Sequence, residues 1–185
     1  MENVVSSLAD RALADRHEAY ESEIRRLLDA ALAVMQRQTT IDPRVSDIVS
    51  EAGLSNQAFY RHFRGKDALL VALLEDGRER LVTTIERRLA GARSPAERLR
   101  AWIEAVFAQA QDATAADATR PFAINGDRLA AAYPDEARRS RGRLVEPLRV
   151  IVGTVNANAV YHLTMGLVHD ALMDRSGWPK IEFDG

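Results

Sequence analysis

The stretch that decides the fold is "RVSDIVSEAGLSNQAFYRHFRGKDALL", Arg44–Leu70. Apolar residues at three- and four-residue spacing predict a helix that ends at Gly53, where a residue without Cβ can adopt a left-handed backbone. Ser55 is a natural N-cap for a second, short helix, which Gly65 then ends. Two short helices joined by a tight turn containing glycine indicate a helix-turn-helix.

The second short helix is expected to have two faces of different chemistry. Leu54, Phe59 and Phe63 would point inward and hold the corner between the helices. Asn and Gln side chains can bond base edges in a DNA major groove, and Tyr and Arg can reach phosphates or bases. Spacing alone leaves a plain helical corner of an all-α protein as an equal alternative. The outward face consists of Asn56, Gln57, Tyr60 and Arg61.

The same stretch resembles the DNA-binding signature of the TetR family of bacterial transcriptional regulators. The shared elements are a Val-x-x-Ile helix, Ala-Gly-Leu-Ser at the turn, Phe-Tyr-x-His-Phe, and Lys-Asp-x-Leu-Leu. The match covers Arg44–Leu70, and Glu18–Gln38 is similar to the first helix of the family. The chain departs from the pattern at Asn56-Gln57-Ala58, where Lys-Gly-Thr is common. This difference leaves the operator sequence open.

The resemblance implies a role for each matching position. Ser55 would cap the recognition helix, and Asn56 and Gln57 would lie nearest the base edges. Phosphate contacts would come from the second half of that helix and from the starts of the second and fourth helices, because helix N-termini favour anions. The charge between residues 36 and 66 is 5 − 3 = +2, which makes phosphate binding feasible. The predicted DNA-binding set is Arg44, Ser55, Asn56, Gln57, Tyr60, Arg61, His62 and Lys66.

Composition limits the class of protein. The 185 residues are enough for one or two small domains, and plentiful Leu and Ala with few Gly and Pro favour an all-α fold. The net charge of −2 argues against nucleic acid when taken alone, but a local basic surface can still bind phosphate. The chain has no cysteine, no run of eighteen apolar residues and no secretory signal pattern at its start. We therefore expect a cytoplasmic protein without a membrane span.

The helical pattern predicts two domains. Residues 1–65 are expected to form an N-terminal three-helix helix-turn-helix domain, with its first helix over Glu18–Gln38. Residues 66–185 are expected to form a C-terminal helical bundle for ligand binding and dimerisation, opened by a long helix from Lys66. About eight helices and no strand are predicted in all.

Three features of the C-terminal half complicate the helical pattern. "PFAINGDRLAAAYP", Pro121–Pro134, reads as a broken or short helix between two prolines. Pro147 lies inside the next helix and predicts a kink or a break there. Two helices then follow with almost no residues between them, so either the turn at Gly153 is unusually tight or a loop is missing from the chain. The tail, Ser176–Gly185, is expected to be irregular.

A set of aromatic and polar residues in this half suggests a pocket. The family resemblance implies a cavity for a small, largely apolar effector. For each residue alone, ordinary core packing is the favoured alternative. His162 and His169 lie seven residues apart, but ligands at i and i+4 would be needed for a persuasive metal site, so neither a metal nor a cofactor is expected. The candidate ligand-binding residues are Trp102, Phe107, Phe122, Asn125, Tyr133, Tyr161 and His162.

These features together predict a one-component, ligand-responsive DNA-binding regulator rather than an enzyme. The resemblance implies a homodimeric repressor on a palindromic operator, dimerised through the last two helices, about residues 135–152 and 155–174. The alternatives are an activator or a ligand-binding adaptor of the same fold, and a helical metal-dependent enzyme. No nucleophile–base pair or phosphate-cradling loop favours the enzyme.

Overall fold

The computed structural model describes residues 4–38 and 42–174. Every regular element in these ranges is an α-helix, and there are seven of them. The chain divides into two compact units, residues 1–69 and 70–185. The irregular tail expected at residues 176–185 falls outside the described residues. The predicted all-α fold class is confirmed.

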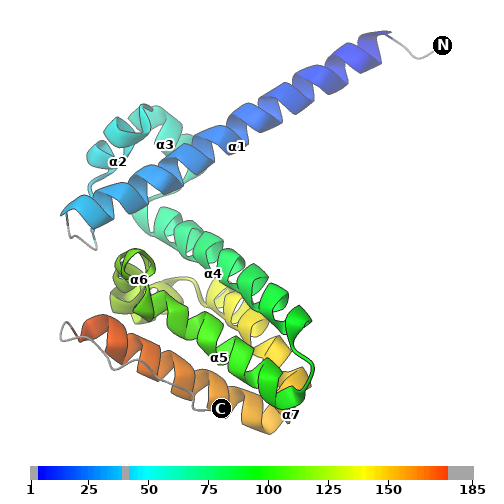
Figure 1. The fold of residues 1–185 in the computed structure, drawn as a ribbon. Coiled ribbons are helices and arrows are strands. Elements are labelled where there is room, and N and C mark those ends of the chain that lie inside the picture. The colour runs from blue at the N-terminus through cyan, green and yellow to red at the C-terminus, as the bar shows by residue number, and fades with distance from the viewer. Residues whose placement is uncertain (1–3, 39–41, 175–185) are drawn as a thin grey trace. The chain divides into compact units, whose positions relative to one another are not determined.

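The first unit packs three helices and the start of a fourth (Figure 1). They are α1 (Val4–Gln38), α2 (Val45–Ala52), α3 (Asn56–His62) and the first turn of α4 (Lys66–Gly91). Both α2 and α3 pack against α1 and against each other. Side chains at three- and four-residue spacing on α1 form the buried face, as that periodicity requires. The core residues include Leu27, Ala31, Val34, Met35, Ile48 and Phe59.

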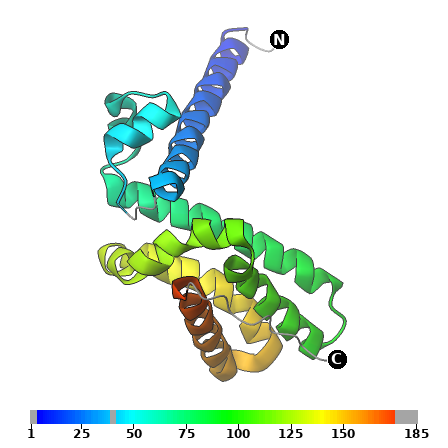
Figure 2. The same cartoon turned by 60° about the vertical axis from the view of Figure 1, so that its left-hand side comes forward.

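The first helix is much longer than predicted. It begins at Val4 rather than Glu18 and extends well past α2 and α3 (Figure 2). The apolar stripe begins only with Ile24 and Leu27, so periodicity gave no signal for the earlier turns. Residues 6–22 are exposed throughout, and their alanine, arginine and glutamate content favours helix without packing. This half of α1 is a helix by propensity and by continuation from the packed half.

The second unit is a helical bundle around one apolar core. It contains the rest of α4, α5 (Pro95–Gln111), α6 (Ala113–Ala132) and α7 (Pro134–Met173). Contacts run between α5 and α7, between α6 and α7, and between α5 and α6. Ser94 and Asp112 cap α5 and α6 by accepting a hydrogen bond from a backbone N–H three residues on. The core includes Ile85, Trp102, Val106, Leu144, Leu148 and Leu172.

Two local predictions in this unit are corrected. The region from Pro121 is not broken: α6 continues through that proline to Ala132. In α7 the non-helical backbone lies at Gly153 rather than at Pro147, and the two halves of α7 run in different directions (Figure 1). Gly153 has φ 80° and ψ 160°, a conformation that favours glycine, so a single residue makes the turn.

Hydropathy within the described residues agrees with this picture: none of these helices is both long enough and apolar enough to cross a membrane.

Candidate DNA interface and effector pocket

The corner between α2 and α3 has the geometry that the sequence predicts. Gly53 has φ 62° and ψ 38°, the left-handed conformation that ends a helix. The N–H of Leu54 donates to the carbonyl of Val49 at 2.9 Å, which closes the turn. Ser55 then caps α3, its hydroxyl accepting from the N–H of Ala58 at 3.1 Å. These bonds fix the direction in which the recognition helix leaves the turn.

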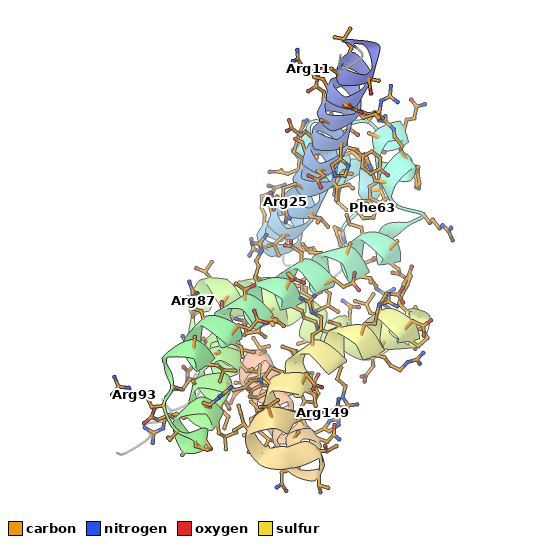
Figure 3. All side chains as sticks on the ribbon, turned by 90° about the vertical axis from the view of Figure 1, so that its right-hand side faces the viewer. Arg11, Arg25, Phe63, Arg87, Arg93 and Arg149 are labelled. Atoms are coloured by element: carbon orange, nitrogen blue, oxygen red, sulfur yellow. The ribbon has the colours of Figure 1, made fainter. Side chains whose placement is uncertain are left out.

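The recognition helix, α3, has one buried and one exposed face. Ala58 and Phe59 are buried, and Phe63, just beyond the end of α3 in Figure 3, is buried with them. Tyr60 is 62% exposed although it carries a large aromatic ring. A capped helix of seven residues with this polar face is of a size that a major groove admits. The exposed face carries the predicted outward residues Asn56, Gln57, Tyr60 and Arg61.

His62 does not lie on that exposed face, so its expected phosphate contact is not supported. Its side chain is fully buried, and Nε2 lies 2.6 Å from Oε2 of Glu23 on α1. The ring of Tyr20 packs edge-on against it, with centroids 4.3 Å apart. His62 lies at the end of α3 on the side that faces α1, and its imidazole packs there as a structural residue. In this position neither ring nitrogen is accessible to a phosphate.

Glu23 holds the recognition helix through two residues. Besides His62, it accepts a hydrogen bond from Arg61, whose Nη1 lies 3.3 Å from the same carboxylate oxygen. The hydrogen bond from His62 and the positive charges of Arg61 and Arg26 lower the pKa of Glu23, against a smaller opposing effect of burial. The carboxylate therefore stays ionised to a lower pH than an ordinary glutamate does. Arg61 is exposed, but its charge already has an internal partner.

Two further cations of the first unit, one at a helix start and one at a helix end, are also paired within it. Lys66, predicted to meet a phosphate, forms an ion pair with Asp42. Arg37 of α1 pairs with Glu51 of α2 at 2.8 Å. Arg44, at the start of α2, is exposed as a phosphate contact requires. Since both partners of the Lys66 pair are partly exposed, a phosphate can compete with the carboxylate for the ammonium group.

Sequence reasoning missed the residues of α1 that hold the corner. The guanidinium of Arg26, one turn after Glu23, donates to the carbonyls of Ala52 and Gly53 at the end of α2. These carbonyls have no partner within the helix, so the guanidinium satisfies them. Glu23 and Arg26 are 26 to 39 residues from their partners in sequence, and no local pattern marks so distant a contact. Both helices of the motif are thus tied to α1 by side chains one turn apart.

In the second unit the predicted ligand-binding aromatics are core residues. Trp102 is fully buried, and its Nε1 donates to the carbonyl of Leu144 at 3.1 Å. Phe107 and Tyr161 belong to the same apolar core. The guanidinium of Arg141 lies over the Tyr161 ring, 5.3 Å from its centroid. The alternative of ordinary core packing therefore describes these three aromatic residues.

The remaining candidates are dispersed. Asn125 is buried, and its side chain donates to the carbonyl of Pro121 at 2.9 Å, within its own helix. Phe122 is half-buried, and His162 is exposed, with Nε2 accepting from Arg141 at 2.8 Å. Of the seven predicted residues, Tyr133 alone lines the small cavity between α4, α6 and the start of α7. These seven residues thus do not gather around one cavity in the described part of the chain.

That cavity has a volume of about 30 Å³ and is partly open to solvent. Leu74 of α4 and Leu129 of α6 give it apolar walls. Arg78 also lines it, a residue that sequence reasoning did not single out, because one arginine on a charged helix face carries no signal. In the described ranges, no group of three or more His, Asp or Glu side chains is arranged to hold a metal ion.

Comparison with known proteins agrees with the geometry of the first unit. The family described as "Bacterial regulatory proteins, tetR family" matches residues 27–73. Among curated proteins, the HTH-type transcriptional regulator BetI of Brucella canis is 29% identical over 140 residues, which is 74% of this chain and 71% of the relative. BetI of Brucella anthropi is 30% identical over 87 residues, covering 47% of this chain and 45% of the relative.

Solved structures share the fold over most of the chain. SCO7518 of Streptomyces coelicolor A3(2) aligns with a TM-score of 0.71 at 19% identity, covering 85% of this chain and 91% of that one. The transcriptional regulator FadR of Bacillus subtilis, in complex with stearoyl-CoA, aligns with a TM-score of 0.68 at 17% identity, covering 83% and 89%. At these identities the likeness concerns the fold alone.

The helix-turn-helix corner, the family match over it and the regulators that share sequence with most of the chain all agree. Residues 27–73 therefore form a helix-turn-helix of the tetR family of bacterial regulatory proteins, and the chain as a whole is similar to transcriptional regulators with an N-terminal DNA-binding helix-turn-helix.

Proposed function

We propose that this regulator is a homodimeric repressor that a small, largely apolar effector releases from a palindromic operator. Two recognition helices would enter successive major grooves about 34–36 Å apart. Effector binding in the second unit would weaken operator binding by the first, and by linkage DNA would weaken effector binding by the same factor. Residues 1–65 would serve as the DNA-binding domain and 66–185 as the domain for ligand binding and dimerisation.

The observation that carries the DNA-binding part is the exposed face of α3. Asn56, Gln57 and Tyr60 are exposed on a short helix whose start is capped by Ser55. A helix that served only as a structural corner would not need amide side chains at its exposed start. Amides at these positions are suited to bonding adenine edges in the major groove.

Dimerisation is supported by apolar side chains that α7 leaves in solvent. Val155 is 86% exposed and Leu163 is 67% exposed. Ala159 and Gly166 are exposed beside them on the second half of α7. Small and apolar residues on one helix face allow the close approach of a second helix, and two-fold pairing would place the same face of a second copy against it.

Coupling between the sites is supported by the extent of α4. This helix is continuous from Lys66, a predicted phosphate contact, to Gly91 in the second unit. An effector that shifted α4 would therefore move Lys66 and change how the two recognition helices fit successive grooves.

The DNA-binding part is tested by selecting bound sites from random duplex DNA with the purified protein, followed by titration at several salt concentrations. We expect a palindromic consensus and an affinity that falls steeply with salt as phosphate contacts are screened. Gln57→Ala should change base preference at one position of each half-site by about 1–3 kcal/mol. Lys66→Ala should weaken binding to all sequences and reduce the salt slope by about 1.

Arg87→Ala is the matched control, because it removes one exposed positive charge from the same helix but in the second unit. It should leave both affinity and slope unchanged. A protein that selects no duplex, or whose binding is insensitive to salt, would contradict the proposal. Selection of a site that activates a reporter on binding would establish an activator instead of a repressor.

A further inference from the structure

Arg78 occupies an unusual position in the second unit. It lies near the middle of α4, is half-buried, and lines the small cavity together with Tyr133 and Leu129. Burial lowers the pKa of its guanidinium below the ordinary arginine value, against smaller opposing effects of Tyr161 and Glu75. Because arginine stays protonated in proteins, the group remains charged and has lost part of its hydration.

Within the described part of the chain, Arg78 has no hydrogen-bond or ion-pair partner. Two other arginines of the second unit are paired, and one of them is Arg80, which pairs with Asp76 at 2.7 Å on the same helix. Arg143 of α7 forms a double ion pair with Glu79 of α4. These two exposed arginines have ion-pair partners, whereas the half-buried Arg78 has none, although a desolvated charge has the greater need of one.

The other charged groups at the cavity do not supply the missing partner. Glu136, which also lines it, pairs with Arg139 at 3.2 Å. Glu75 lines the cavity but is exposed, so solvent screens it, and it forms no ion pair with Arg78. The remaining walls are apolar or aromatic, with Leu74, Leu129 and Tyr133 among them.

We propose that Arg78 binds the acidic group of the effector, which is a small organic anion with a short apolar tail. This inference rests on the proposed effector-responsive function and specifies its ligand. A cavity of about 30 Å³ has room for a carboxylate-sized group beside the guanidinium. Arginine presents a fork of donors that matches a carboxylate in two hydrogen bonds. The tail would lie against Leu74 and Leu129, and binding would require these walls to move apart.

The test is calorimetric titration of the full chain, without DNA, with butyrate, hexanoate and octanoate at up to millimolar concentration. Octylammonium and 1-octanol are the cationic and neutral probes of the same length as octanoate. We expect the carboxylates to bind, more tightly as the tail lengthens, and the other two to bind at least ten-fold more weakly. Arg78→Gln should weaken octanoate binding about ten- to a hundred-fold, the factor expected for losing a charge-assisted bond.

Arg80→Gln is the matched control, since it removes the same charge from an exposed position on the same helix and should leave octanoate affinity unchanged. Arg78→Lys retains the charge but loses the fork, and should give an intermediate affinity. Circular dichroism of each variant shows whether it is folded. The proposal is wrong if no carboxylate binds, if octylammonium or octanol binds as tightly as octanoate, or if the folded Arg78 variants bind octanoate normally.

This outcome is separable from that of the proposed function. Salt-sensitive operator binding by the ligand-free protein tests the regulator, whereas the titration without DNA tests the site. If octanoate binds at Arg78 and operator affinity does not change, the anion site stands and the proposed coupling fails.

Discussion

At the scale of single residues, one carboxylate organises the recognition helix. Glu23 is bonded to Arg61 and to the buried His62, and so joins α1 to α3. Arg61 is therefore less available to DNA than its exposure suggests, because a phosphate must compete with Glu23 for it. The pairing also links the orientation of α3 to the ionisation of one side chain.

Glu23→Gln should destabilise the first unit in a pH-dependent way. The pKa of Glu23 is lowered in the folded protein, so its stabilising effect is complete above its unfolded pKa and disappears as the pH falls through the lowered folded value. We expect the largest difference in unfolding midpoint between wild type and variant at neutral pH. That difference should shrink toward zero below about pH 4, which urea titrations from pH 7 to pH 3 would measure.

Glu18→Gln is the control for this series, because Glu18 is exposed on the same helix. It should leave the midpoint nearly unchanged at every pH. A Glu23→Gln difference that stays constant across the range would show that packing, and not ionisation, accounts for the effect.

At the scale of elements, the corner between α2 and α3 depends on a residue that can be left-handed. Gly53 has φ 62°, and a Cβ there would lie 3.1 Å from Nη2 of Arg26. A substitution would therefore strain the backbone and displace the guanidinium from the carbonyls that end α2. The left-handed turn at Gly53 and the hydrogen bonds from Arg26 therefore depend on each other.

Gly53→Ala should destabilise the first unit by about 1–2 kcal/mol, the cost of the left-handed conformation for a residue with a Cβ, with more if Arg26 is displaced. Gly77→Ala, on the exposed side of α4 with nothing within 4 Å of the added carbon, should instead stabilise by about 0.5–1 kcal/mol. Chemical denaturation of both variants measures the contrast. Equal effects from the two substitutions would show that the corner does not depend on the left-handed backbone of Gly53.

Local chemistry explains which elements could be predicted from the sequence. Ser55 as a cap and Gly53 as a helix end depend on neighbours within four residues, so their pattern is visible in the chain. The exposed half of α1 could not be found by periodicity, since it buries nothing. The position of His62 depends on Glu23, 39 residues away, and no local signal predicts that contact.

The candidate effector site could be predicted only in part, for a related reason. Aromatic composition suggested a pocket, but whether an aromatic lines a cavity or fills a core depends on how four helices pack. Trp102 fills the core, whereas Tyr133 reaches the cavity from the junction of α6 and α7. Arg78 is notable only for lacking a partner, a property that a sequence cannot show.

At the scale of the whole molecule, the second half of α7 presents apolar side chains that the monomer does not bury. If the proposed dimer forms through this face, Leu163→Glu should give a monomer, because a buried charge without a partner costs several kcal/mol at an interface. Sedimentation analysis would show the change in mass. Affinity for a full palindrome should fall much further than affinity for a half-site, because the two helix-turn-helix domains would no longer bind as a linked pair.

Leu13→Glu is the matched control, since Leu13 is 61% exposed on α1, close to the 67% of Leu163. It should leave the oligomeric state unchanged. A monomer from Leu13→Glu, or a dimer that survives Leu163→Glu, would place the interface elsewhere.

The long exposed half of α1 also has a consequence for how the protein folds. An isolated helix of this length is marginal in water, because nucleation costs more than a few turns return. We therefore expect the exposed turns to become helical only once α2 and α3 have packed on residues 23–35, with the helix extending backward toward Val4. Backbone amides in these exposed turns should exchange with solvent before those of the packed half.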